Sequence, residues 1–155
     1  MAFNFVGCDR DQELLLPPSL HEWLAEDHLA WFVLDAVDAI DLGGFYVEYR
    51  DDGWGRAAFD PAMMVALLLY AYAVGIYSSR KIAKACVERV DFMAIVALQA
   101  PDFHTVSEFR RRHLAALSAL FVQVLKLCEL AGLVKLGHVA AAGPSASHQQ
   151  GLADR

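Results

Sequence analysis

The sequence predicts an all-α protein, and three observations support this prediction. Hydrophobic residues make up 57% of the 155 residues, which suits a globular chain with its own core and argues against disorder. Apolar residues recur at three- and four-residue steps in several segments, as they do along one face of a helix. Helix start and stop signals separate these segments. We expect about five helices, among them a helix-turn-helix-like pair and one long spine helix.

The first part of the chain predicts two helices and much irregular structure. Residues 1–18 are expected to form an extended loop, and Ser19 is a suitable cap for a short helix in the stretch SLHEWLAEDH. Residues 26–40 predict an amphipathic helix that Gly43 and Gly44 end. The expected buried face of this helix consists of Leu29, Phe32, Val33, Ala36, Val37 and Ile40. Residues 45–59 predict a loop with one short strand.

An uncharged run at residues 61–77 predicts a helix buried in the core. Asp60 suits the N-cap, and Pro61 suits the first helical position because its missing N–H would have no partner there. Gly75 can end the helix. The run lies at the lower edge of what spans a bilayer, so a membrane helix is the alternative. Its tyrosines, and the lack of a second such segment, favour the core helix.

A second, basic helix follows the turn after Gly75, and the order helix, short turn, helix is that of a DNA-binding helix-turn-helix. In this helix Arg80 and Lys84 are one turn apart and so share a face. Two serines stand at its N-terminus, where hydroxyls and backbone N–H groups can contact phosphate. The residues expected to contact DNA here are Ser78, Ser79, Arg80, Lys81 and Lys84. The alternative is an ordinary helical hairpin with a solvated basic face.

A long helix is expected at residues 105–131, where Thr105 and Glu108 form a capping box and Gly132 provides the stop. It carries the second basic cluster, which consists of Arg110, Arg111 and Arg112. Three consecutive residues fan out over about 200°, so one or two of them at most can face a shared partner. Phosphate contact is one interpretation. A solvated helix start, paired with Asp91, Asp102 or Glu108, is the other.

Charge is distributed unevenly beneath the formal net charge of −6. The chain up to Asp60 has 13 acidic and 3 basic residues, whereas the remainder has 6 acidic and 10 basic residues. Such asymmetry can mark a part that faces nucleic acid beside an acidic part. Uneven surface solvation is the alternative.

No residue set suggests catalysis or a metal site. The six histidines form no H-E-x-x-H pair, and His28, His104 and His113 suit capping or packing. No Gly-rich phosphate loop or G-x-S-x-G is present. The chain has three widely spaced cysteines, Cys8, Cys86 and Cys128. Each is expected to be a small buried apolar residue in a reducing compartment. The N-terminus lacks signal-peptide features, so we expect a cytoplasmic protein that needs no cofactor.

Several stretches occur together in a familiar order. They are EDHLAWFVLDAVDAIDL, YRDDGWGRAAFDPAMMVALLLYAYAVGIYSSRKIAKAC, PDFHTVSEFRRRH and LFVQVLKLCELAGLVKLGHVA. Over residues 13–139 the chain resembles the InsH-like N-terminal domain of bacterial DDE-type insertion-sequence transposases. The resemblance implies a helical region that precedes an RNase H-like catalytic domain and helps to bind the ends of the element. The residues of the S-S-R-K-I helix, Ser78 to Lys84, and the F-R-x-R-H motif at 109–113 match the family.

The chain departs from this family near residue 140. The family continues to an Asp-Gly-Thr motif, whose Asp is the first carboxylate that holds the two catalytic metals, magnesium in this family. Here the stretch reads Ala140-Ala141-Ala142-Gly143-Pro144. We therefore expect a truncated transposase with a helical domain at 1–132, the start of a lost catalytic domain at 133–140 and an unstructured tail at 141–155.

The expected role is DNA binding without catalysis. The expected partners are the terminal inverted repeats of an element, and a second copy of the chain or full-length transposase. The alternative is a helical protein–protein interaction module without DNA affinity, which can inhibit full-length transposase.

Overall fold

The computed structural model describes residues 5–11, 19–47, 49 and 58–130. The chain divides into two units, Met1–Ala119 and Leu120–Arg155. In the second unit, only residues 120–130 are described. The expected strand at 133–140 and the expected tail at 141–155 lie outside the described residues, as do the expected domain boundaries after residue 130.

The described residues confirm the all-α prediction. They form seven α-helices, one 3-10 helix (η1) and two short strands. In chain order these are β1 (Phe5–Val6), η1 (Leu20–Glu22), α1 (Leu29–Asp38), α2 (Gly43–Tyr46), β2 (Ala58–Phe59), α3 (Pro61–Ala73), α4 (Ser79–Glu88), α5 (Val90–Ile95), α6 (Phe103–Arg112) and α7 (Leu114–Leu130).

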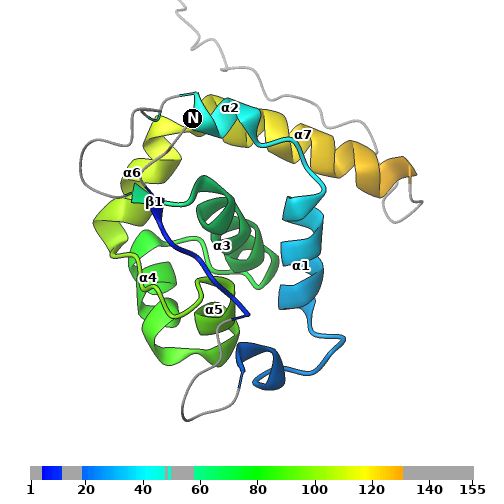
Figure 1. The fold of residues 1–155 in the computed structure, drawn as a ribbon. Helices are drawn as coiled ribbons and strands as arrows, with labels where there is room; N and C mark the ends of the chain where they lie inside the picture. Colours follow the sequence, from blue (N-terminus) through cyan, green and yellow to red (C-terminus); the bar gives the residue numbers. More distant parts are fainter. Residues whose placement is uncertain (1–4, 12–18, 48, 50–57, 131–155) are drawn as a thin grey trace, which may run out of the picture. The chain divides into compact units, whose positions relative to one another are not determined.

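Helix α3 lies at the centre of the first unit, with α1 on one side and α4 and α5 on the other (Figure 1). It packs directly against α1 and α5. Its buried residues point in every direction around the axis: Pro61, Met63, Met64, Val65, Ala66, Leu67, Leu68, Tyr70 and Ala71. A helix that is apolar all round belongs in a core or a membrane. The structure confirms the core helix, and no described helix is long and apolar enough to cross a membrane.

Both ends of α3 follow the predicted signals. The Asp60 carboxylate accepts a hydrogen bond from the Ala62 N–H (2.9 Å), with Pro61 at the first position. At the other end Gly75 has a φ of +80°, a left-handed conformation that suits glycine. The N–H of the next residue, Ile76, bonds back to the Ala71 carbonyl (2.7 Å) and closes the helix.

Helix α1 is shorter than expected and turned about its axis. It begins after His28, whose ring Nδ1 accepts a hydrogen bond from the Ala30 N–H (3.1 Å). The buried residues are Ala30, Val33, Leu34 and Val37. Leu29 and Phe32, for which the spacing predicts burial, are 42% and 67% exposed. Nearly every position besides the aspartates is apolar, so the spacing alone allows two overlapping faces, and packing on α3 selects one of them.

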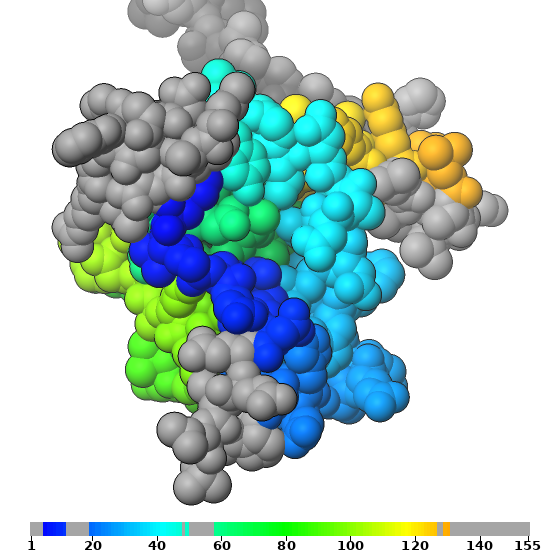
Figure 2. All heavy atoms as spheres, in the orientation of Figure 1, coloured from blue at the N-terminus to red at the C-terminus, as the bar shows by residue number. Residues whose placement is uncertain are grey.

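The segments around α1 show one confirmation and two differences. Ser19 caps η1 as predicted, although the helix is only one turn long. Gly43 and Gly44 do not end a helix but begin α2, where the Asp41 carboxylate accepts the Gly43 N–H (2.8 Å). The short strand expected within 45–59 exists as β2, and it pairs in parallel with β1, at residues expected to form a loop. The segment containing β1 lies over part of α3 (Figure 2).

The expected long helix at 105–131 is two helices that meet at His113. This residue departs from helical geometry (φ −101°, ψ 24°), and its ring is buried and stacks on Tyr49 at 5.7 Å. The helix also starts earlier than predicted: Asp102, not Thr105, is the N-cap of α6, and its carboxylate accepts the Thr105 N–H (2.7 Å). Both residues are good caps, and only the structure shows which one the chain uses.

A buried carboxylate, Asp91, fastens α5 to α3. It accepts hydrogen bonds from the Tyr70 hydroxyl (2.7 Å) and from the Arg89 guanidinium (2.5 and 3.1 Å). Burial alone raises the pKa of Asp91, but the hydrogen bonds from Arg89 and Tyr70 outweigh it, so the pKa lies below its ordinary value of 3.8. A carboxyl group with a lowered pKa stabilises the fold above its unfolded pKa, and that contribution is lost as pH falls through the folded pKa.

Replacing Asp91 with Asn is expected to lower the free energy of unfolding by about 1–3 kcal/mol near neutral pH, because two donors lose a charged acceptor. The difference from wild type should narrow as pH falls below the ordinary carboxyl pKa of 3.8 and through the lowered pKa of the folded state. Urea unfolding over a pH series measures both effects. Asp38→Asn, at an exposed position of α1, is the control and should change little. An equal loss for the two variants would show that Asp91 does not fasten α5.

Candidate nucleic-acid interface

Helix α4 has one buried face and one cationic face. Its buried residues are Ile82, Ala85 and Cys86. Arg80, Lys81 and Lys84 are exposed. Successive residues turn by about 100° around a helix, so the three cations share the side opposite the buried residues. Because α4 packs on α5 and α6 with its apolar face, the cationic face remains open to a partner.

The turn before α4 has the predicted position, but its serines differ from each other. Ser78 stands at the N-cap and is exposed, and its side chain makes no capping hydrogen bond. The Ser79 hydroxyl is 2.5 Å from Arg110 Nη2, which donates to it. Phosphate contact by the two serines stays a prediction, and of the two only Ser78 is exposed.

Arg110 connects α6 to the turn that leads into α4. Its Nη1 donates to the Tyr77 carbonyl (2.7 Å) and to the Tyr72 hydroxyl (3.2 Å), while its Nη2 donates to Ser79. One guanidinium therefore holds the end of α3, the turn and the first residue of α4. We call this set of contacts the Arg110 clamp. The sequence predicts DNA contact for Arg110, and the clamp occupies both of its terminal nitrogens.

The other two arginines of α6 point elsewhere. Arg111 is exposed and donates from Nε and Nη2 to both oxygens of Glu108 (3.0 and 2.7 Å). This pairing lowers the pKa of Glu108 and raises the pKa of Arg111. Arg112 lies on a further side of α6, where it lines a groove. The three arginines thus fan out as the sequence indicates, and α6 presents no joint cationic surface.

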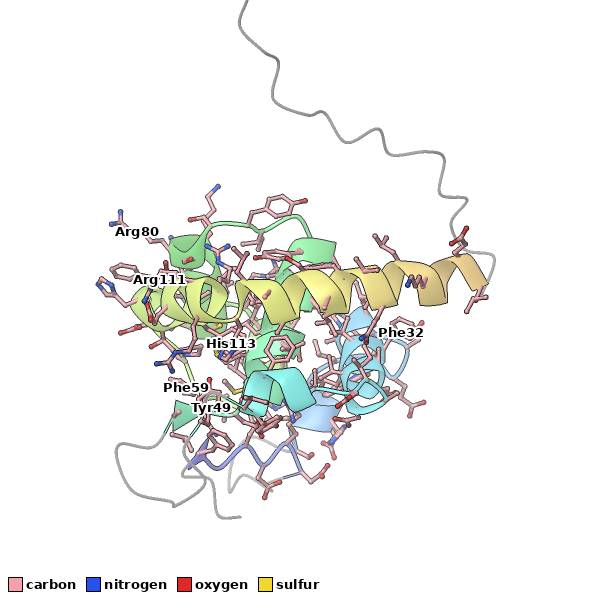
Figure 3. The ribbon with its side chains drawn as sticks, turned by 90° about the horizontal axis from the view of Figure 1, so that it is seen from above. Phe32, Tyr49, Phe59, Arg80, Arg111 and His113 are labelled. Atoms are coloured by element: carbon pink, nitrogen blue, oxygen red, sulfur yellow. The ribbon has the colours of Figure 1, made fainter. Side chains whose placement is uncertain are left out.

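Arg80 is the cation of α4 whose side chain is held by the protein. Its guanidinium carbon lies 5.2 Å from the centre of the Phe103 ring, which in turn packs against the His104 ring at 4.1 Å. Lys84 has a loose contact with Glu88 (3.8 Å). Among the described residues, neither Arg80 nor Lys81 has a carboxylate partner. Figure 3 shows Arg80 and Arg111 at one end of the first unit and Phe32 at the other.

A groove of about 810 Å³ lies between the two strands and α6. Apolar residues and the polar side chains of α6 line it: Val6, Tyr49, Ala58, Phe59, Met64, Asp102, His104, Thr105, Glu108, Phe109 and Arg112. Its two carboxylates are already engaged, since Asp102 caps α6 and Glu108 pairs with Arg111. The groove therefore offers mixed charges and no concentrated site for an anion.

The described residues contain no group of three or more His, Cys, Asp or Glu side chains placed to hold a metal ion. His28 caps α1 and His113 packs in the core, as predicted. Cys86 is buried in α4, and burial raises the pKa of its thiol to about 12, which keeps it protonated as a packing residue. The side chain of Cys128 lies outside the described residues.

The pattern of a known family, described as a transposase domain (DUF772), matches residues 18–112. The chain belongs to this transposase family. The transposase domain so defined contains α1 to α6, and with them the cationic face of α4 and the Arg110 clamp. No curated protein and no solved structure matches the chain. The assignment to the DDE type and the truncation near residue 140 stay predictions.

Sequence reasoning missed the aromatic and carbonyl partners in this part of the transposase domain. Phe103 supports Arg80, and Tyr72 and Tyr77 accept hydrogen bonds from Arg110. The clamp joins residues 31 to 38 positions apart, so no local spacing reveals it. The signal available was an arginine triplet on a helix, of which one member had to face the protein.

Arg110→Ala is expected to lower the free energy of unfolding by about 2 kcal/mol, because it removes the clamp and leaves its acceptors without a charged donor. Urea unfolding measures the change. The matched control is the neighbouring Arg111→Ala, which removes only an exposed ion pair and should change stability little. Equal stabilities for the two variants would contradict the structural role of Arg110.

Proposed function

We propose that this transposase domain binds DNA through the cationic face of α4 and serves to hold the ends of a mobile element. Membership of the transposase family supports a role in transposition. The observation that carries DNA binding is the convergence of Arg80, Lys81 and Lys84 on the open side of α4, opposite its apolar face.

Charge concentrates the proposed binding on this face. The chain as a whole carries a formal charge of −6, so its net charge does not favour binding to phosphate. A cluster of cations on one helix can still bind DNA, since affinity comes from the phosphates it neutralises and the counterions it releases. The acidic excess before Asp60 helps to restrict the surface that DNA can approach.

The Arg110 clamp has a positioning role in this proposal. A recognition helix reads DNA only if its N-terminal end is held at a defined height and angle. Arg110 donates to the hydroxyl of Ser79, the first residue of α4, and to the carbonyl of Tyr77, two residues earlier. Arg110 therefore supports DNA binding indirectly, by positioning α4. Arg111 and Arg112 are the members of the triplet that are proposed to contact phosphate, beside the cationic face of α4.

The proposed role is binding without chemistry. By resemblance, the first metal-binding carboxylate belongs near residue 140, and the stretch Ala140-Ala141-Ala142-Gly143-Pro144 contains none. The proposed DNA target is the terminal inverted repeat of an element, and the proposed protein partner is a second copy or full-length transposase. Incubation with such ends and Mg²⁺ should give complexes but no cleaved or joined strands.

Replacing Arg80, Lys81 and Lys84 together with Ala should weaken DNA binding strongly. The plot of log K against log salt concentration should flatten by roughly 0.9 for each phosphate that the variant no longer neutralises. Fluorescence anisotropy with labelled duplexes at several salt concentrations measures both quantities. Lys126→Ala, at an exposed position of α7, is the control and should leave the slope unchanged. If the triple variant binds with wild-type affinity and slope, α4 is not the DNA-binding surface.

A protein–protein interaction module is the second candidate function, and one observation favours it. Phe32 is 67% exposed and Leu29 is 42% exposed on α1. If this surface carries the function, Phe32→Ser will abolish association with full-length transposase, and the triple α4 variant will have no effect. Under the DNA-binding proposal, the triple α4 variant loses DNA binding and Phe32→Ser keeps it.

A further inference from the structure

We propose that Arg80 recognises a guanine base in the DNA that α4 binds, whereas Lys81 and Lys84 contact the phosphate backbone. This inference rests on the proposed DNA binding by α4 and adds to it a division of labour among the three cations. It makes Arg80 the residue that determines sequence preference.

The position of Arg80 suits base contact. It is the second residue of α4, directly after Ser79, and lies in the first turn of the helix. Helices that enter the major groove contact base edges with their N-terminal residues. Lys84 lies one turn further along the same face. The clamp ties down the start of α4, since Arg110 donates to the Ser79 hydroxyl next to Arg80 and to the Tyr77 backbone carbonyl.

The side chain of Arg80 is also held in place. Its guanidinium lies over the Phe103 ring at 5.2 Å, and the adjacent His104 ring packs against Phe103. A cation–π contact of this kind uses none of the guanidinium N–H groups as hydrogen-bond donors, so they remain available. No described residue accepts a hydrogen bond from Arg80. An arginine ordered before binding loses less conformational entropy when it meets its target.

An unoccupied guanidinium is missing from the neighbouring cations Arg110, Arg111, Lys81 and Lys84. Arg111 has its fork occupied by both oxygens of Glu108, and Arg110 is engaged by the clamp. Lys81 and Lys84 carry compact ammonium groups on flexible stems, which suit phosphates rather than the paired acceptors of a base. Arginine alone offers two parallel N–H groups that match O6 and N7 of guanine.

The experiment begins with selection of sites from random-sequence duplexes by the whole chain. The selected site should contain a guanine whose replacement by adenine weakens wild-type binding about 10-fold or more, in line with the discrimination that a bidentate contact provides. Replacing this guanine with 7-deazaguanine, which lacks the N7 acceptor but keeps normal pairing, should weaken wild-type binding in the same way.

Variants then assign the contact to a residue. Arg80→Ala removes every donor of the side chain, and it should bind guanine, 7-deazaguanine and adenine sites almost equally. Lys81→Ala and Lys84→Ala should lower affinity for all three sites by the same factor and flatten the salt dependence, with the guanine preference kept. Phe103→Leu removes the ring beneath Arg80, and it should reduce the preference while leaving the salt dependence unchanged.

Three results would overturn the inference. One is a wild-type chain that binds DNA with the predicted salt dependence but without base preference, which leaves the proposed function intact. Another is an Arg80→Ala variant that still distinguishes guanine from 7-deazaguanine. The third is a wild-type chain that binds no duplex at all, and this result also removes the proposed function. Circular dichroism of each variant confirms that a loss of preference does not come from unfolding.

Discussion

Helix α3 carries apolar side chains all around its axis, so the rest of the transposase domain has to surround it. Each large side chain that it buries contributes about 1.5–3 kcal/mol relative to an exposed one. This burial explains why α1 packs against α3 with Ala30, Val33, Leu34 and Val37 and leaves Phe32 outside. It also explains why Asp91 is buried and needs hydrogen bonds from Tyr70 and Arg89.

The two ends of α3 connect this buried helix to the elements at the surface of the domain. At its start, Asp60 caps the helix and also accepts the Tyr46 hydroxyl (2.8 Å), which connects α3 to α2. At its end, Gly75 reverses the chain toward α4. The Arg110 clamp then fixes the turn, and α4 lies with Ile82, Ala85 and Cys86 inward. The burial of α3 therefore determines the orientation of α4 and of its cationic face, because the Gly75 turn and the Arg110 clamp connect the two helices.

Features that depend on neighbouring residues could be predicted from the sequence. The Asp60-Pro61 start, the Gly75 stop, the burial of α3 and the exposure of Arg80 and Lys84 all follow from local spacing and side-chain type. The helix boundaries near Thr105 required a choice between two good caps, Asp102 and Thr105, and only tertiary packing makes that choice. The break at His113 was missed because it depends on a ring that stacks with Tyr49, distant in the chain.

The candidate site shows the same division. Its position on α4 could be predicted, because a basic stripe opposite an apolar stripe can be read from residues three and four apart. The separate roles of the cations could not. They depend on partners from α6 and the turn: Phe103 beneath Arg80, Glu108 beside Arg111, and Tyr77 and Ser79 around Arg110. Parallel pairing of Phe5 with Ala58 is likewise a long-range contact without a local pattern.

In the proposed complex, α4 presents the DNA-binding surface and α1 does not. A nuclear magnetic resonance titration of the isotopically labelled chain with a selected duplex tests it most directly, because every backbone amide reports on its own surroundings. We expect shifts concentrated at residues 78–84, with smaller shifts at Arg111 and Arg112 and none around Phe32. Shifts that cluster on α1, or a spectrum that does not change with added duplex, would contradict it.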